Sequence, residues 1–383
     1  MTKNICIVAG ARPNFIKVAP ILHAINNARK EGRDICCNLV YTGREDDPTI
    51  EPSLFESLQM NRPDTYLGAN DENLNELTGH VMAAFSAYLS AHKTDAVIVV
   101  DDLASTMASA IVTKKQGILL AHLVAGTRSF DINMPKEINR LVIDGLSDLL
   151  FTAGTGSNSA VTREGAEQSK VYMVGNILMD TLRLNHSRLR RPEVFDRLGL
   201  KAGEYIVFTL NRKVLIENKA NLKDMLVAMN DNSAGHPIIA PLRPSAENVV
   251  KAIEKEFGLN MSALHIINPM QYLEFGYLAA HALGIVTDSG NVAEEATFNS
   301  VPCITLNSYT EHIETVKQGT NVLVGEDASR LSQQMQLMTA GRWKKGGIPD
   351  RWDGRSAERI VCILEETIDR NIRQKQGKDK QTI

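Results

Sequence analysis

Short apolar runs alternate along the chain with longer segments in which apolar residues recur every three or four positions. The apolar runs do not alternate with polar residues, which is typical of strands covered on both faces and therefore of a mainly parallel sheet. In the first half the pattern predicts strands at residues 4–10, 38–43, 96–102, 121–126, 149–154 and 171–175. Helical patterns lie between them, most clearly at residues 14–30 and 74–93.

The same pattern restarts after a basic, linker-like segment at residues 183–204. The second set of strands is predicted at residues 205–210, 237–242, 264–268, 283–287 and 302–306, with a further candidate at 321–325. The fold class is therefore α/β, with two Rossmann-like domains in tandem and a cleft between them. We expect the first domain at residues 1–182, the second at 183–354 and a polar, flexible tail at 373–383.

Composition and charge exclude several classes of protein. A chain of 383 residues suits two domains, and 43% hydrophobic with 23% charged residues is ordinary for a globular protein. The net charge of −3 gives no reason to expect nucleic acid or a membrane surface as partner. Five scattered cysteines form no metal-ligand pattern, so we expect no metal and no cofactor. No leader or membrane-spanning stretch is evident, and we expect a cytoplasmic location.

The stretch "IVTDSGNVAEEATFNSVPCITL" at residues 285–306 reads as strand, tight turn, helix and strand. Ser289, Gly290 and Asn291 would present backbone N–H groups at a helix N-terminus, where an anion such as phosphate is favoured. Glu295 lies more than a turn further on and could accept from a vicinal diol such as ribose. This combination predicts a nucleotide site. The alternative is an N-cap followed by two solvated acids, Glu294 and Glu295.

Two further strand ends carry polar groups. In "GARPNFIK", Arg12 supplies a fork for an anion and Lys17 a second positive charge, although a common βα turn explains the same residues. In "VVDDLAST", Asp101 and Asp102 end an apolar strand. One of these acids could be a general base, and the other could cap the following helix.

A charged loop follows the strand at 121–126. It holds Arg128, Asp131, Glu137 and Arg140, which is typical of a substrate site, although an exposed loop with weak ion pairs explains the pattern as well. His122, at the strand itself, is more simply a satisfied packing residue than a catalyst.

Together these segments resemble the non-hydrolysing UDP-N-acetylglucosamine 2-epimerases over residues 5–364. The resemblance rests on "GARPNFIKVAP", "AHLVAGTRSFDINMP", "EINR", "VGNILMDTL", "TDSGNVAEEA" and "WDGRSAERIV" in this order. It implies the glycosyltransferase-B type of fold, a UDP-sugar in the cleft, a final helix at 355–372 that packs back toward the N-terminal domain, and a homodimer formed through that domain. It also implies that Arg12, Ser289 and Gly290 face the diphosphate, Glu295 the ribose and Phe275 the uracil.

The chain departs from the family pattern where the chemistry takes place. Asp102 and Arg140 match family residues, and Glu137 keeps the second glutamate of "PEE". Val124, however, stands where "HVEAG" has glutamate, and Lys136 replaces the first glutamate of "PEE".

Three further departures lie outside that loop. Asn211 stands where the family has a histidine by the phosphates, and His312 replaces an arginine. Arg44 and Glu45 replace the "QH" that many bacterial members use for a second, activating UDP-N-acetylglucosamine, which suggests that this second site is lost.

We therefore interpret the chain as a UDP-sugar-binding protein of this family whose acid–base chemistry is lost or redirected. Lys136 near Asp102 would make that acid a weaker base. One alternative is a working epimerase with relocated acids, for example Glu137 and Asp131. Another is a UDP-sugar-dependent glycosyltransferase or hydrolase. A third, a structural partner without ligand, is disfavoured by the retained binding residues.

Overall fold

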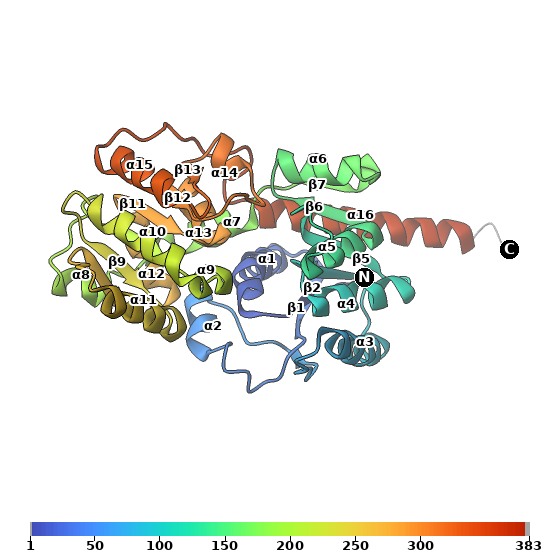
Figure 1. Cartoon of the computed structure of the whole chain (residues 1–383). Coiled ribbons are helices and arrows are strands. Elements are labelled where there is room, and N and C mark those ends of the chain that lie inside the picture. The colour runs from blue at the N-terminus through green and yellow to red at the C-terminus, as the bar shows by residue number, and fades with distance from the viewer. Residues whose placement is uncertain (1, 380–383) are drawn as a thin grey trace. The chain divides into compact units, whose positions relative to one another are not determined.

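The computed structural model describes residues 2–379, which form two compact units. The first unit comprises the N-terminal 184 residues together with the segment from Asp350 onward, and the second comprises Asn185–Pro349. Most elements of both units are labelled in Figure 1. Every strand predicted from the sequence is present, including the candidate at 321–325, and the α/β fold class is confirmed.

The first unit is built on a seven-stranded parallel sheet in the order β3-β2-β1-β4-β5-β6-β7. Its strands are β1 (Lys3–Ala9), β2 (Ile35–Tyr41), β3 (Thr65–Tyr66), β4 (Ala96–Val100), β5 (Leu119–Ala125), β6 (Leu149–Thr152) and β7 (Val171–Met173). Its helices are α1 (Arg12–Lys30), α2 (Pro52–Leu58), α3 (Leu74–Ala91), α4 (Ala104–Lys115), α5 (Pro135–Leu146), α6 (Thr155–Arg163), α7 (Ile177–Asn185) and α16 (Ser356–Asp379).

The second unit is built on a six-stranded parallel sheet in the order β10-β9-β8-β11-β12-β13. Its strands are β8 (Ile206–Thr209), β9 (Ile238–Pro241), β10 (Leu264–Ile267), β11 (Gly284–Thr287), β12 (Cys303–Thr305) and β13 (Asn321–Leu323). Its helices are α8 (Glu193–Arg197), α9 (Lys213–Glu217), α10 (Lys219–Asp231), α11 (Pro244–Phe257), α12 (Tyr272–Ala280), α13 (Gly290–Phe298), α14 (Glu314–Lys317) and α15 (Ala328–Thr339).

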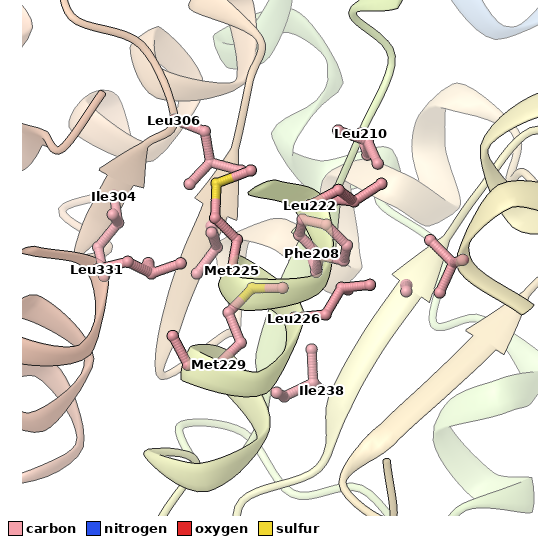
Figure 2. Packing of buried hydrophobic residues seen from close by; sticks show 14 of the residues in the cluster. Phe208, Leu210, Leu222, Met225, Leu226, Met229, Ile238, Ile304, Leu306 and Leu331 are labelled. Carbon is pink, nitrogen blue, oxygen red and sulfur yellow. The ribbon is translucent and has the colours of Figure 1, made fainter. Parts of the chain in front are cut away.

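Both faces of the second sheet are covered, which explains its unbroken apolar strands. Successive side chains of a strand point to opposite faces. Ile206 and Phe208 therefore pack on one face with α10 and α15, as Figure 2 shows for Phe208 and four residues of α10, Leu222, Met225, Leu226 and Met229. Val207 packs on the other face with α12 and α13. Phe195 and Leu200 join this second core, so the latter part of the segment expected as a linker is part of the domain.

The end of the chain belongs to the first unit. Trp352 is fully buried there and its indole donates to the carbonyl oxygen of Ala153 at 3.0 Å. The carboxylate of Asp180 accepts from the backbone N–H groups of Ser356 and Ala357 at 3.0 and 2.7 Å, at the start of α16. The helix then packs against α1. It continues to Asp379, so residues 373–379 of the expected tail are helical, whereas residues 380–383 lie outside the described part of the chain.

Candidate functional site

Each sheet has one position where the strand order reverses. In the first sheet this switch lies between β1 and β4, and in the second between β8 and β11. Ligands of open α/β sheets bind at the carboxyl ends of the strands flanking such a switch. Three of the strand ends singled out from the sequence, those of β1, β4 and β11, flank these two positions.

Asp101 joins the ends of β1 and β4. Its carboxylate accepts from the amide of Asn14 at 2.7 Å and lies 2.5 Å from the ammonium of Lys17. The Asn14 oxygen in turn accepts from the backbone N–H groups of Gly10 and Ala11. The turn predicted to bind an anion is thus fixed by an internal network, and the charge of Lys17 is compensated by Asp101.

Gly10 and Arg12 differ in role. A Cβ at Gly10 would lie 2.3 Å from the hydroxyl of Ser105, so only glycine allows this close approach. Arg12 begins α1 and is half-buried, and no ion pair holds its guanidinium within residues 2–379. Arg12 is therefore the cation of this turn with a charge left for a ligand.

Asp102 is an ion-paired carboxylate. Two guanidinium nitrogens of Arg140 lie 2.7 and 2.8 Å from one of its oxygens, and the ammonium of Lys136 lies 3.4 Å from the other. The expected helix cap at this strand end is wrong for both acids, because α4 begins after Leu103 without a side-chain cap. The register of β4 and the helical spacing of α5 bring these charges together instead.

The carboxylate of Glu137 is hydrogen-bonded to the loop that precedes α5. Its carboxylate accepts from the backbone N–H groups of Ser129 and Phe130 at 2.9 and 3.1 Å, and it lies 3.0 Å from Arg140. Burial opposes ionisation of Glu137, but these donors outweigh it and lower the pKa of this acid. Asp131, by contrast, is exposed and accepts from the N–H of Asn133.

Val124 occupies an unusual backbone position at the end of β5. Its φ is 72°, in the left-handed region that β-branched residues rarely adopt, and the pairing with β6 shifts register at this point. Such strain persists only where the surrounding structure enforces it, and it is common at functional sites. The valine side chain can neither donate nor accept a proton.

A buried network that the sequence did not reveal lies beneath these residues. One ring nitrogen of His122 lies 2.6 Å from Asp144 and the other 2.9 Å from the carbonyl oxygen of Asp101. Both ring nitrogens therefore have a polar partner within the fold. Arg128 lies 2.7 Å from the second oxygen of Asp144 and also pairs with Glu164. The expectation that His122 is a satisfied residue is confirmed, and the network fixes the backbone of Asp101.

Asp288 organises the switch position of the second sheet. One carboxylate oxygen accepts from the backbone N–H groups of Asn211 and Arg212 at 2.7 and 2.6 Å, which ties the end of β8 to the end of β11. The other oxygen is buried without a hydrogen-bond partner among the described residues. Ser289 follows as the N-cap of α13, and its side chain makes no cap hydrogen bond.

The predicted anion turn lies at the start of α13. Gly290 is exposed and Asn291 half-buried, and a Cβ at Gly290 would meet no atom within 4 Å. The turn therefore has open space in front of a helix N-terminus, where backbone N–H groups and the helix dipole favour an anion. Phe275 lies on α12 and packs partly against the core of the unit.

The two adjacent acids of α13 are buried, so the alternative of two solvated acids is wrong. Glu294 lies 2.7 Å from a ring nitrogen of His312. Burial, and then the charge of Glu294, raise the pKa of Glu295 to about 8. Burial and the charge of Glu295 raise the pKa of Tyr272, whose hydroxyl has no hydrogen-bond partner within the described chain.

The fold and the site together define a class of protein. Parallel sheets of two Rossmann-like domains, one of them with an open anion turn and a buried acid, are those of glycosyltransferase-B type proteins. The lipopolysaccharide outer core galactosyltransferase WaaB shares this fold with a TM-score of 0.58 at 13% identity, covering 94% of this chain and 99% of its own.

The family is narrower than the fold. The family model of UDP-N-acetylglucosamine 2-epimerase matches residues 27–365. The UDP-N-acetylglucosamine 2-epimerase of Methanocaldococcus jannaschii is 33% identical over 373 residues, covering 94% of this chain and 98% of that protein. Its crystal structure in complex with UDP-GlcNAc and UDP has a TM-score of 0.80 at 32% identity, covering 95% and 99%. The chain belongs to the UDP-N-acetylglucosamine 2-epimerase family.

Proposed function

We propose that the chain binds a UDP-sugar, with the diphosphate at Ser289 and Gly290 and the ribose at Glu295, and that it exchanges the carbon-2 proton of that sugar poorly. The open turn of α13 and the buried acid one turn further on support the binding. The glycosyltransferase-B fold and the family support the class of ligand.

The ion pairing of Asp102 supports the proposal that the carbon-2 proton is exchanged poorly. Epimerisation through carbon 2 needs an acid and a base in reach of that carbon. Asp102 is held by Arg140 and Lys136 instead of standing free, and Val124 offers no second carboxylate. Losing one general acid or base costs roughly two to four decades in rate.

The alternative of relocated acids is weaker. The carboxylate of Glu137 is hydrogen-bonded to the loop and ion-paired with Arg140, and its lowered pKa makes it a poor base. Asp131 lies exposed in the loop and accepts from the backbone N–H of Asn133.

The test follows carbon 2 by proton NMR in deuterium oxide. With UDP-N-acetylglucosamine we expect binding but neither deuterium incorporation nor the manno epimer on the time scale of an active relative. The triple variant Val124→Glu, Lys136→Glu, Asn211→His should gain exchange, with Glu256→Ala, an exposed acid of the second unit, as the control. Robust exchange by the unmodified protein would restore the ordinary epimerase.

A second candidate function is glycosyl transfer or hydrolysis of the same UDP-sugar. It is favoured by the Lys136–Asp102 pair, because the lysine side chain is 58% exposed and the pair could serve an acceptor hydroxyl. Release of UDP, measured with and without added acceptor sugars, decides between this candidate and a protein that only binds.

We also propose a homodimer through the first unit. The apolar stretch at residues 81–89 of α3 is one candidate from the sequence for the dimer surface, but its side chains Val81, Phe85, Tyr88 and Leu89 are buried in their own unit and do not supply it. Ile138 and Leu141 are 46% and 37% exposed and lie one turn apart on α5, which favours that helix. Light scattering should report a dimer at micromolar concentration, and the double change Ile138→Ser, Leu141→Ser should give a monomer. A monomeric unmodified protein would refute the proposal.

Location is a separate matter. Among residues 2–379, no helix has the length and apolar character required to cross a membrane. A cytoplasmic location stays a prediction from the sequence, which cell fractionation would test.

A further inference from the structure

The segment at residues 306–313, which follows β12, is tied to the second unit near both ends. Near its start, the amide of Asn307 accepts from the guanidinium of Arg212 at 2.5 Å and donates to the carbonyl oxygen of Asp288 at 3.3 Å. Near its end, the Nε2 of His312 lies 2.7 Å from a carboxylate oxygen of Glu294. The segment therefore joins the switch position to the buried acids of α13.

The contact between His312 and Glu294 is an ion pair only when the imidazole ring of His312 is protonated. The side chains of His312 and Glu294 are only 14% and 3% exposed. Removing a cationic partner from a buried carboxylate is destabilising, because burial has already removed most of its hydration. Glu294 also precedes Glu295 directly, so a change of net charge at the His312–Glu294 pair falls next to the acid proposed to bind the ribose.

The groups around the ring are mostly acidic. Glu294 comes from α13, Glu311 from the segment itself and Glu314 from α14, while Glu295 follows Glu294 on α13 and its charge acts on Tyr272 of α12. Burial opposes the charged ring, but Glu294, Glu314 and Glu311 outweigh it and raise the pKa of His312 above its ordinary value.

We propose that His312 is a positioning residue of the nucleotide site: its protonated ring holds Glu294 and the 306–313 segment in the arrangement that binds the nucleotide. The inference deepens the proposed function and rests on it. Loss of the ring proton removes the ion pair between His312 and Glu294 and adds net negative charge beside the anion turn. A nucleotide with an anionic diphosphate then binds less tightly.

The sign of the pH dependence follows from the direction of the shift. Because the pKa of His312 is raised, the pair is present at acid pH and is lost as the pH rises through that raised value. Glu295 also ionises in this range, as the pH rises through about 8, and this ionisation is common to the unmodified protein and to variants of His312. We therefore expect affinity to fall with rising pH.

The experiment measures the dissociation constant of UDP-N-acetylglucosamine by calorimetry from pH 6 to pH 8.5. This probe is suitable because its diphosphate is esterified at both ends, so it lacks the ionisation near pH 6 of a terminal phosphate such as that of UDP. We expect affinity to fall about tenfold across the range for the unmodified protein, since one pKa unit of coupling corresponds to a factor of ten.

Three variants isolate His312. His312→Arg keeps a permanent charge, so its pH profile should contain the contribution of Glu295 but not that of His312, and the difference between the two profiles belongs to His312. His312→Gln should bind about tenfold more weakly at pH 6 and approach the unmodified protein at high pH. The matched control is His236→Gln, which changes a histidine of the same unit whose ring contacts a backbone carbonyl oxygen. It should leave the profile unchanged.

The outcomes separate the two proposals. Binding with identical profiles for the unmodified protein and His312→Arg would overturn the role of His312 and leave UDP-sugar binding intact. Absence of binding at every pH would overturn both. Thermal melting of each unliganded variant reports folding, and if His312→Gln does not fold, the comparison with His312→Arg decides.

Discussion

At the scale of single residues, Asp144 is a buried charge of the first unit that is held by several partners. It is buried, pairs with His122 at 2.6 Å and with Arg128 at 2.7 Å, and accepts from the backbone N–H of Gly126 at 3.0 Å. Removing one partner from a buried pair costs about 3 to 5 kcal/mol, because the remaining charges stay buried without compensation.

We therefore expect Asp144→Asn to lower the free energy of unfolding by about 3 kcal/mol at pH 7. Burial opposes ionisation, but His122 and Arg128 lower the pKa of Asp144 below 3.8. The contribution is thus present above that value and is lost as the pH falls through the lowered pKa, so the difference between the two proteins should shrink in strong acid. Urea unfolding at pH 7 and at pH 3 measures it.

The control is Asp369→Asn, the same chemical change at a surface pair 3.1 Å from Lys3. An exposed pair contributes less than about 1 kcal/mol. Equal losses for the two variants would contradict the role of the Asp144 network.

Sequence reasoning located single residues only in part. Asp102 and Arg140 were singled out because each has a charge close to a strand end. Asp144, Asp288 and the His312–Glu294 pair were missed, because their partners lie far away in sequence and meet only through strand register. One signal was available for Asp144: it lies four residues after Arg140 on α5, which places both on the same helix face.

At the scale of elements, unbroken apolar runs were enough to predict twelve of the thirteen strands. They succeed because most of these strands are buried on both faces, as Phe208 and Val207 show on opposite sides of β8, whereas the edge strands β7 and β10 are only partly buried. The missed strand, β3, has only two residues, too few for any pattern. The same burial explains why residues 194–200 are not a linker, since Phe195 and Leu200 face the core.

At the same scale, the close contact between Gly175 and Arg351, shortly before α16, leads to a prediction about stability. Gly175 has a φ of +100°, and a Cβ there would lie 2.0 Å from the carbonyl oxygen of Arg351, which leads into α16. Gly175→Ala should lower the free energy of unfolding by roughly 3 kcal/mol and speed hydrogen exchange in the first turns of α16, since strained backbone costs about 1–3 kcal/mol before the clash is added.

Gly165→Ala is the matched control, because Gly165 has a similar φ of +94° but no atom within 4 Å of the added Cβ. It should cost only the left-handed backbone, about 1 kcal/mol. If both variants lowered the free energy of unfolding equally, the close contact of Gly175 with Arg351 would not contribute to stability.

At the scale of the whole molecule, ligand binding should appear as thermal stability. UDP at about a hundred times its dissociation constant should raise the free energy of unfolding by roughly 2.7 kcal/mol. Glu295→Ala should reduce the thermal shift, whereas Glu256→Ala, which removes an exposed acid of the same unit, should not. No shift with any uridine nucleotide at millimolar concentration would contradict the proposed function.

The return of the chain to its first unit also orders the events of synthesis. The second unit is continuous in sequence, but the first receives Trp352 and α16 only after everything between has been made. At about 5–20 residues per second, the first unit waits roughly ten to forty seconds on the ribosome with the surface for its last helix exposed. The usual order of folding is thereby inverted: the second unit can be finished first, and chaperones that bind nascent chains have a long-lived apolar target in the first.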